Sequence, residues 1–430
     1  MKIDSSKKAN TTTKPTIAHV YKETLDNGVR VLLDPMPQVR SASIGLYIDA
    51  GSANELPQEN GTAHCIEHML FKGTTKHSSR QLSEIQNLLG GQINAYTNTE
   101  TLCLHASVVD NQLLAAMDIM TEMMLESLFS PAEIERERTV ILDEIAMCED
   151  DPEEAIMDLF LNTIYPNHPL GRPIIGTAKT VAQINQDDLL SFMHREFTPD
   201  RLILSVTGNF DLEQIREKAH ELLDNLKPGA TGMPQTPLTV PETRFSVRHE
   251  HRKLQQTHLC LGGIGPHRTH KDWPGFNLMM MALGGSTSSR IFQQIRENNG
   301  LAYNIGATGY PGRNTGCYII DGATTNKNLD RVVDLCRKEI DNLRTRPITD
   351  YELRIARQQC ATGLLLGLES TNARMSRMAT SEMLFGRHVS VEEAIDQINK
   401  ITTDDIAKLA DQYLIGTPYA LTTIGAKASA

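Results

Sequence analysis

Alternating apolar and polar residues mark two strands near the start of the chain, followed by helical segments. The stretches VRVLLDP and SASIGLYIDAG predict strands over residues 29–35 and 41–51. A helix is predicted at about residues 62–71, and the next one, SSRQLSEIQNLLGG, begins at a serine cap and ends at Gly90 and Gly91. INAYTNTETLCLHASVV then alternates like two paired strands. Strands and helices are therefore mixed in one unit.

Two longer helices follow, NQLLAAMDIMTEMMLESL and SPAEIERERTVILDEIAMCE. The second opens with Ser130 at the N-cap, Pro131 at the first helical position and Glu133 two residues later. A serine followed three residues later by glutamate predicts a capping box, in which each side chain bonds the backbone of the other residue.

The second half of the chain repeats the first. Residues 227–243 are rich in proline and glycine, without a long apolar run, and are predicted to be a linker. FSPAEIERERTVILDEIAMCE resembles PITDYELRIARQQCATGLLLG, with Glu133 and Glu352 at the same place. We therefore predict an α+β fold of two homologous domains, 1–226 and 244–430, each a mostly antiparallel sheet packed with helices.

Composition narrows the possible partners. The chain has 430 residues, 40% of them hydrophobic, which exceeds one ordinary core, and its net charge of −11 argues against a nucleic-acid partner. The seven cysteines are odd in number and form no Cys-x-x-Cys pair, so neither a disulfide framework nor a cysteine zinc site is indicated. No segment approaches the roughly 18 apolar residues of a membrane span, so we expect a cytoplasmic protein without a membrane partner.

The segment GTAHCIEHMLFKG carries His64, Glu67 and His68. On a helix, residues four apart lie on one face, so the two imidazoles can face one ion while Glu67 borders the same face. The pentapeptide alone leaves two readings open: a catalytic metal site, or a helix that happens to carry two histidines.

A catalytic zinc site needs a third protein ligand and one open position. The helix ERERTVILDE offers Glu137 and Glu144, seven residues apart and so on one stripe. The alternative is a charged face in water. In the repeat, however, Ala356 and Gly363 stand at these two places, so the second half keeps the scaffold without the candidate ligands. Because the candidate ligands occur in only one of the two copies, a catalytic role is favoured over a role in folding.

His-x-x-Glu-His followed by a glutamate 76 residues after its last histidine resembles the inverzincin peptidases of the pitrilysin (insulinase) family. GTAHCIEHMLFKGT, GGQINAYTNTE and SSRIFQQIRENNGLAY are most similar to its smaller members, the bacterial processing-peptidase-like proteins and the β subunit of the mitochondrial processing peptidase. The resemblance covers essentially the whole chain.

The resemblance implies a zinc endopeptidase that hydrolyses extended or unfolded peptides, in processing or in peptide clearance. His64, His68 and Glu144 would hold one Zn²⁺ per chain, Glu67 would be the general base, and Glu137 would support the site by orienting a ligand. Manganese or cobalt in place of zinc stays open. The alternative function is a non-catalytic subunit that binds peptides or supports a catalytic partner.

The resemblance also implies five residues that contact the substrate. Asn94, Ala95 and Tyr96 would form an edge strand that pairs with substrate backbone. Arg296 and Tyr303 would reach the substrate carbonyl. From pattern alone, the strand could equally belong to an ordinary hairpin, and the pair could be a helix cap and a sheet residue.

Larger members of the family carry four such domains in one chain, with the zinc in the first domain and the arginine and tyrosine in the fourth. This chain has two, so the resemblance predicts a homodimer whose active sites are shared between chains.

Overall fold

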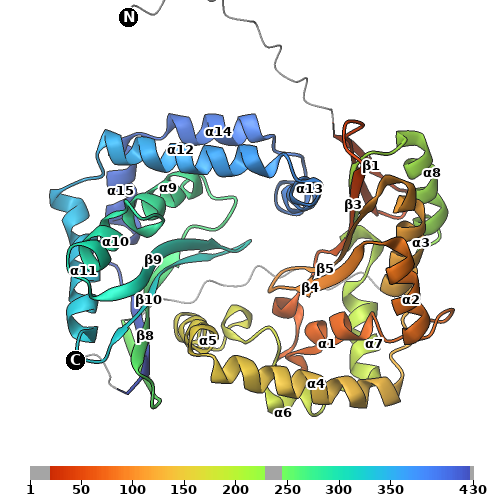
Figure 1. Cartoon of the computed structure of the whole chain (residues 1–430), viewed down its shortest axis with the longest axis horizontal. Coiled ribbons are helices and arrows are strands. Elements are labelled where there is room, and N and C mark those ends of the chain that lie inside the picture. The colour runs from red at the N-terminus through yellow and green to blue at the C-terminus, as the bar shows by residue number, and fades with distance from the viewer. Residues whose placement is uncertain (1–19, 228–244, 427–430) are drawn as a thin grey trace, which may run out of the picture.

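Two sheets, each with its own set of helices, make up the molecule (Figure 1). The computed structural model describes residues 20–227 and 245–426. The first sheet has the order β1-β2-β6-β3-β5-β4. Its strands are β1 (Tyr21–Thr24), β2 (Arg30–Pro35), β3 (Ser41–Ile48), β4 (Gln92–Thr97), β5 (Leu102–Val109) and β6 (Leu202–Gly208).

The second sheet repeats the topology of the first, without a counterpart of β1. Its order is β7-β11-β8-β10-β9. Its strands are β7 (Ser246–His251), β8 (Gln256–Gly265), β9 (Ala302–Pro311), β10 (Gly316–Thr325) and β11 (Ala420–Gly425). In each sheet one pair is parallel, β2 with β6 and β7 with β11, and the remaining pairs are antiparallel. The prediction of a duplicated, mostly antiparallel α+β unit is confirmed.

The helices also occur in matching order. The first half contains α1 (Thr62–Met69), α2 (Ser79–Leu89), α3 (Leu113–Leu125), α4 (Pro131–Asp150), α5 (Pro152–Ile164), α6 (Ala178–Val181), α7 (Gln186–Glu196) and α8 (Leu212–Leu223). The second half contains α9 (Trp273–Gly284), α10 (Arg290–Phe292), the π-helical turn η6 (Gln293–Glu297), α11 (Leu329–Thr345), α12 (Asp350–Gly367), α13 (Thr371–Phe385), α14 (Val391–Lys400) and α15 (Thr403–Tyr413).

Each half lends one helix to the sheet of the other half. Both faces of the central strands are buried; seven of the eight residues of β3 are buried, for example. One face packs on helices of the same half. The other face of the first sheet packs on α13, where Met375 and Met378 contact Tyr47, and the other face of the second sheet packs on α5 through Phe160. The two halves are therefore joined by two apolar cores in addition to their own.

Several predicted boundaries shift slightly. The strand predicted to end at residue 51 ends at Ile48, and the motif helix ends at Met69. Ser130 caps α4 by accepting a hydrogen bond from the Glu133 backbone, but the predicted capping box is wrong, because the Glu133 carboxylate pairs with Arg136. The predicted linker lies outside the described residues except for its first residue. Within the described ranges, no helix is long and apolar enough to cross a membrane.

Candidate metal centre

A buried carboxylate fixes the start of α1, the helix that carries both motif histidines. Gly61 takes a left-handed conformation with φ of 99°, which turns the chain into the helix. Glu55, 4% exposed, accepts hydrogen bonds from the backbone N–H of Gly61 (3.1 Å) and of Ala63 (2.8 Å). Burial raises the pKa of Glu55 to about 7, although these hydrogen bonds oppose the shift. The carboxylate thus satisfies N–H groups that a helix start leaves unpaired.

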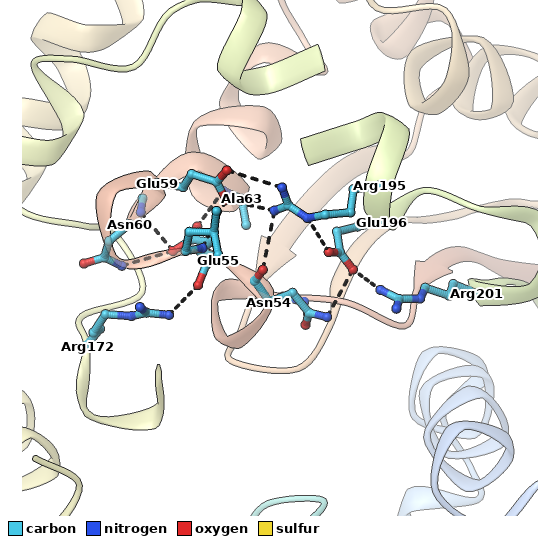
Figure 2. A network of polar contacts seen from close by, with 12 residues as sticks. Asn54, Glu55, Glu59, Asn60, Ala63, Arg172, Arg195, Glu196 and Arg201 are labelled. Atoms are coloured by element: carbon cyan, nitrogen blue, oxygen red, sulfur yellow. Dashed lines mark hydrogen bonds and ion pairs between the residues drawn. The ribbon is translucent and has the colours of Figure 1, made fainter. Parts of the chain in front are cut away.

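Figure 2 shows that Glu55 belongs to a wider polar network around the same turn. Arg172 donates to the Glu55 carbonyl oxygen at 2.7 Å, and the Asn60 side chain donates to the Glu55 carboxylate at 3.1 Å. Arg195 pairs with Glu59 at 2.8 Å and with Glu196 at 2.8 Å. Side chains from three separate segments thus fix the turn that leads into α1. The sequence analysis did not identify this network.

Helices α1 and α4 bring three candidate ligands together. The Nε2 atoms of His64 and His68 lie 3.7 and 3.4 Å from the two carboxylate oxygens of Glu144, and the donor atoms of the three residues all lie within 4.8 Å of one another. Tetrahedral zinc with bonds of about 2.1 Å needs neighbouring ligand atoms roughly 3.4 Å apart. Two imidazoles and one carboxylate at these separations fit a zinc ion.

The protonation of His64 suits metal binding. Its side chain is buried, and burial together with the neighbouring His68 lowers its pKa to about 4. The imidazole is therefore neutral near pH 7, and a neutral imidazole is the form that binds a metal.

Glu137 and Lys72 orient the second imidazole. Glu137 is 6% exposed, and its carboxylate lies 3.2 Å from Nδ1 of His68 and 2.6 Å from Nζ of Lys72. A carboxylate on Nδ1 directs Nε2 toward Glu144 and fixes the ring. Lys72 was missed by the sequence analysis, because it lies in the turn after α1, which ends at Met69, and helix spacing does not place it.

Glu67 lies beside this cluster without joining it. Burial raises its pKa, and hydrogen bonding to Thr97 opposes the shift. Thr97 ends β4, and its hydroxyl oxygen lies 3.5 Å from the Ala63 carbonyl oxygen of α1. The carboxylate of Glu67 therefore stands between the candidate ligands and the end of β4.

β4 is an edge strand of the first sheet and pairs with β5 on one side. Asn94 and Tyr96 are exposed, while Ala95 is buried against the helices. An edge strand carries unpaired backbone groups to which an extended peptide can add. The expected position of this strand is confirmed; peptide binding by it remains a prediction.

Arg296 and Tyr303 lie together but in the second half. The guanidinium carbon of Arg296 is 4.8 Å from the centre of the Tyr303 ring, and Tyr303 is 79% exposed. Figure 1 shows α10, which leads into the turn holding Arg296, on the opposite side of the molecule from α1. Across residues 20–227 and 245–426, neither side chain bonds to His64, His68 or Glu144. The single chain does not bring this pair to the cluster.

Comparison with known proteins places these features in a family. Residues 30–178 match the family described as insulinase (peptidase family M16), and residues 183–360 match the peptidase M16 inactive domain. The chain is 36% identical over 406 residues to a Bacillus subtilis protein described as "Uncharacterized zinc protease YmxG", covering 94% of this chain and 98% of that one. The chain belongs to peptidase family M16.

Two further similar proteins agree with this assignment. A protein of Streptomyces coelicolor, also described as an uncharacterized zinc protease, is 34% identical over 416 residues, covering 95% of this chain and 90% of the relative. A protease from Helicobacter pylori has the same fold, with a TM-score of 0.88 at 19% identity, over 95% of this chain and all of the other. Both proteins are named as proteases. The two family matches together cover both halves of the duplicated fold.

Proposed function

We propose that this M16 protein is a zinc-dependent endopeptidase that hydrolyses peptide bonds in extended or unfolded peptides. The observation that carries the proposal is the convergence of His64, His68 and Glu144 at separations that suit a tetrahedral ion, next to a half-buried glutamate and an edge strand. His64, His68 and Glu144 would hold the ion.

Each remaining group has a definite task in this proposal. A bound zinc ion would lower the pKa of a water ligand and polarise the scissile carbonyl. Glu67 would take the proton of the attacking water and later pass it to the leaving amine, and the upward shift of its pKa brings it nearer to neutrality, where such a base works best. Glu137 and Lys72 would position His68 rather than react.

The alternative is a non-catalytic peptide-binding subunit, and one assay separates the two functions. Purified protein is incubated with a mixture of unfolded peptides, with and without a chelator, and the products are read by mass spectrometry. An endopeptidase cuts inside peptides, loses activity with the chelator and regains it when zinc is restored. Binding without cleavage by the zinc-loaded protein would favour the supporting role.

Replacing the general base tests the assignment of Glu67. Glu67→Gln is expected to bind about one zinc per chain while its rate falls at least a hundredfold, since a general base contributes roughly that much. Glu84→Gln, a change at an exposed glutamate of α2 outside the site, is the matched control. Metal analysis accompanies the rates. A zinc-free Glu67→Gln protein would make Glu67 a ligand, and full activity would remove it from the reaction.

A further inference from the structure

A cavity lies between the two halves, away from the candidate metal centre. It has a volume of about 570 Å³ and is formed by the end of β2 and the turn after it, residues 34–38, and by α13 and the start of α14. Figure 1 shows α13 beside β1 and β3, on the far side of the first sheet from α1. Cavities of roughly 300–1,000 Å³ accept small molecules. No residue of the candidate metal centre lines it.

The wall of this cavity contains buried polar atoms without partners. Asp34 is 1% exposed, and one of its carboxylate oxygens accepts a hydrogen bond from Arg374 at 2.7 Å. Its other oxygen, Nε of Arg377 and Nδ1 of His388 are buried and have no hydrogen-bond partner among the described residues. Since buried polar atoms are normally hydrogen-bonded, these three atoms would gain partners if a ligand in the cavity displaced the side chains that now cover them.

The charge around Arg377 favours an anion. Its Nη2 donates to the carbonyl oxygens of Val389 and Ser390, which are neutral acceptors. Burial lowers the pKa of Arg377, and the attraction of Glu392 offsets only part of this shift. The charge of Arg377 also contributes to lowering the pKa of Arg268. A ligand carboxylate beside Arg377 could accept two hydrogen bonds from its guanidinium and would add to the attraction that Glu392 already supplies.

Apolar side chains form the rest of the wall. Met36 and Met378 are buried, and Leu368 lies at the end of α12. Methionine side chains adapt their shape to different apolar ligands. The cavity therefore combines a cationic end, a buried carboxylate acceptor and a deformable apolar surface.

We propose that this cavity binds an α-carboxylate that carries an adjacent N–H group and an apolar side chain. Arg377 would bind the carboxylate, the unpartnered oxygen of Asp34 would accept from the N–H, and the apolar side chain would contact Met36 and Met378. Both a free apolar amino acid and the C-terminal residue of a short peptide have this chemistry. Because the cavity wall comes from both halves, the bound ligand also links them.

The test is binding of N-acetyl-leucine, leucine and the dipeptide Gly-Leu to the full-length Glu67→Gln protein by calorimetry, with leucinamide as the matched ligand without a carboxylate. We expect the three acids to bind and leucinamide to bind at least tenfold more weakly, a factor that corresponds to one charged hydrogen bond. Stronger binding of leucine indicates a free amino acid, and stronger binding of Gly-Leu indicates a peptide end.

Two variants with opposite expected effects locate the site. Arg377→Gln should weaken binding about tenfold, and Glu392→Gln should strengthen it about threefold because it removes a repelling charge. Glu392 is exposed, so its replacement leaves the fold intact even if Arg377→Gln does not fold. Thermal unfolding checks both proteins. Absence of saturable binding, equal binding of leucinamide, or an unchanged affinity in Glu392→Gln would each overturn the proposal.

Discussion

At the scale of single residues, helix periodicity explains why the candidate metal site could be predicted and its supports could not. His64 and His68 share a face because they are four residues apart, and Glu137 and Glu144 share a stripe because they are seven apart. These relations are local. Glu55 reaches the start of α1 from a turn that precedes Gly61, and its role depends on burial, which no spacing in the sequence encodes.

Glu55 should make the free energy of unfolding decrease as the pH rises toward neutrality. Its pKa is raised from 4.5 to about 7 in the folded protein, so the folded state holds this proton more tightly than the unfolded chain. The contribution of Glu55 to the free energy of unfolding therefore decreases as pH rises from 4.5 to 7, by about 2–3 kcal/mol. Glu55→Gln should lack this decrease.

Urea unfolding of the metal-free proteins at several pH values measures the effect. The wild type minus Glu55→Gln difference in unfolding free energy should shrink across the window. A constant difference would mean that the buried carboxyl titrates alike in both states.

At the scale of elements, the sequence predicted strands and helices well because their signals are periodic. Most boundaries agree within about three residues, including the glycine end of α2 and the serine cap of α4. The use of α5 and α13 on the opposite sheets was not predicted. Both helices are amphipathic segments like their neighbours, and nothing in a local pattern says which sheet a helix covers.

Helices α4 and α12 occupy matching places in the two halves, so their N-terminal caps can be compared. In α12, Glu352 returns to the Thr349 backbone at 2.8 Å and receives two hydrogen bonds from Arg290, at 2.6 and 2.8 Å. Burial by itself would raise the pKa of Glu352, but these hydrogen bonds outweigh it and lower the pKa to about 2. The resulting stability is present above pH 4.5 and is lost as pH falls from 4.5 to 2.

We therefore expect Glu352→Gln to lower the unfolding free energy by about 2 kcal/mol at pH 7, with the difference disappearing near pH 2. Glu133→Gln in α4 should cost less than about 0.5 kcal/mol, because its partner Arg136 is exposed and the cap is open. Denaturant unfolding at pH 7 and pH 3 tests both. Equal losses in the two variants would show that the Arg290 pair adds no stability.

The edge strand β4 provides a test of substrate binding. Ala95→Pro removes a backbone N–H and should weaken binding of extended peptides about tenfold, since strand addition depends on backbone hydrogen bonds. Fluorescence anisotropy with the Glu67→Gln background measures affinity without cleavage, and circular dichroism checks the fold. Ala95→Val is the control, because it keeps the N–H. Unchanged affinity in a folded Ala95→Pro protein would exclude β4 as the peptide-binding strand.

At the scale of the whole molecule, the exchange of α5 and α13 bears on how an active site could be completed. Buried contacts and the ion pairs Lys22 with Glu382 (2.8 Å) and Arg374 with Asp34 (2.7 Å) join the halves. Folding the second half over α1 would break these contacts. A second copy of the chain could instead bring its Arg296 and Tyr303 to the cluster without disturbing either half.

We therefore propose a twofold homodimer in which His64, His68, Glu144 and Glu67 come from one chain and Arg296 and Tyr303 from the other. Sedimentation should show a dimer. Two variants, Glu67→Gln and the double variant Arg296→Ala with Tyr303→Phe, should each be nearly inactive alone.

Mixing the two variants decides whether the site is shared. In a mixed dimer, one site combines the intact Glu67 of the double variant with the intact Arg296 and Tyr303 of the other chain, while the second site has neither. With free exchange at equal amounts, half of the dimers are mixed, so activity should return to about a quarter of the wild-type rate. If all groups came from one chain, every site would keep one defect. Exchange is verified by labelling each variant with a different fluorophore, and a mixture that exchanges but stays inactive would rule out the shared site.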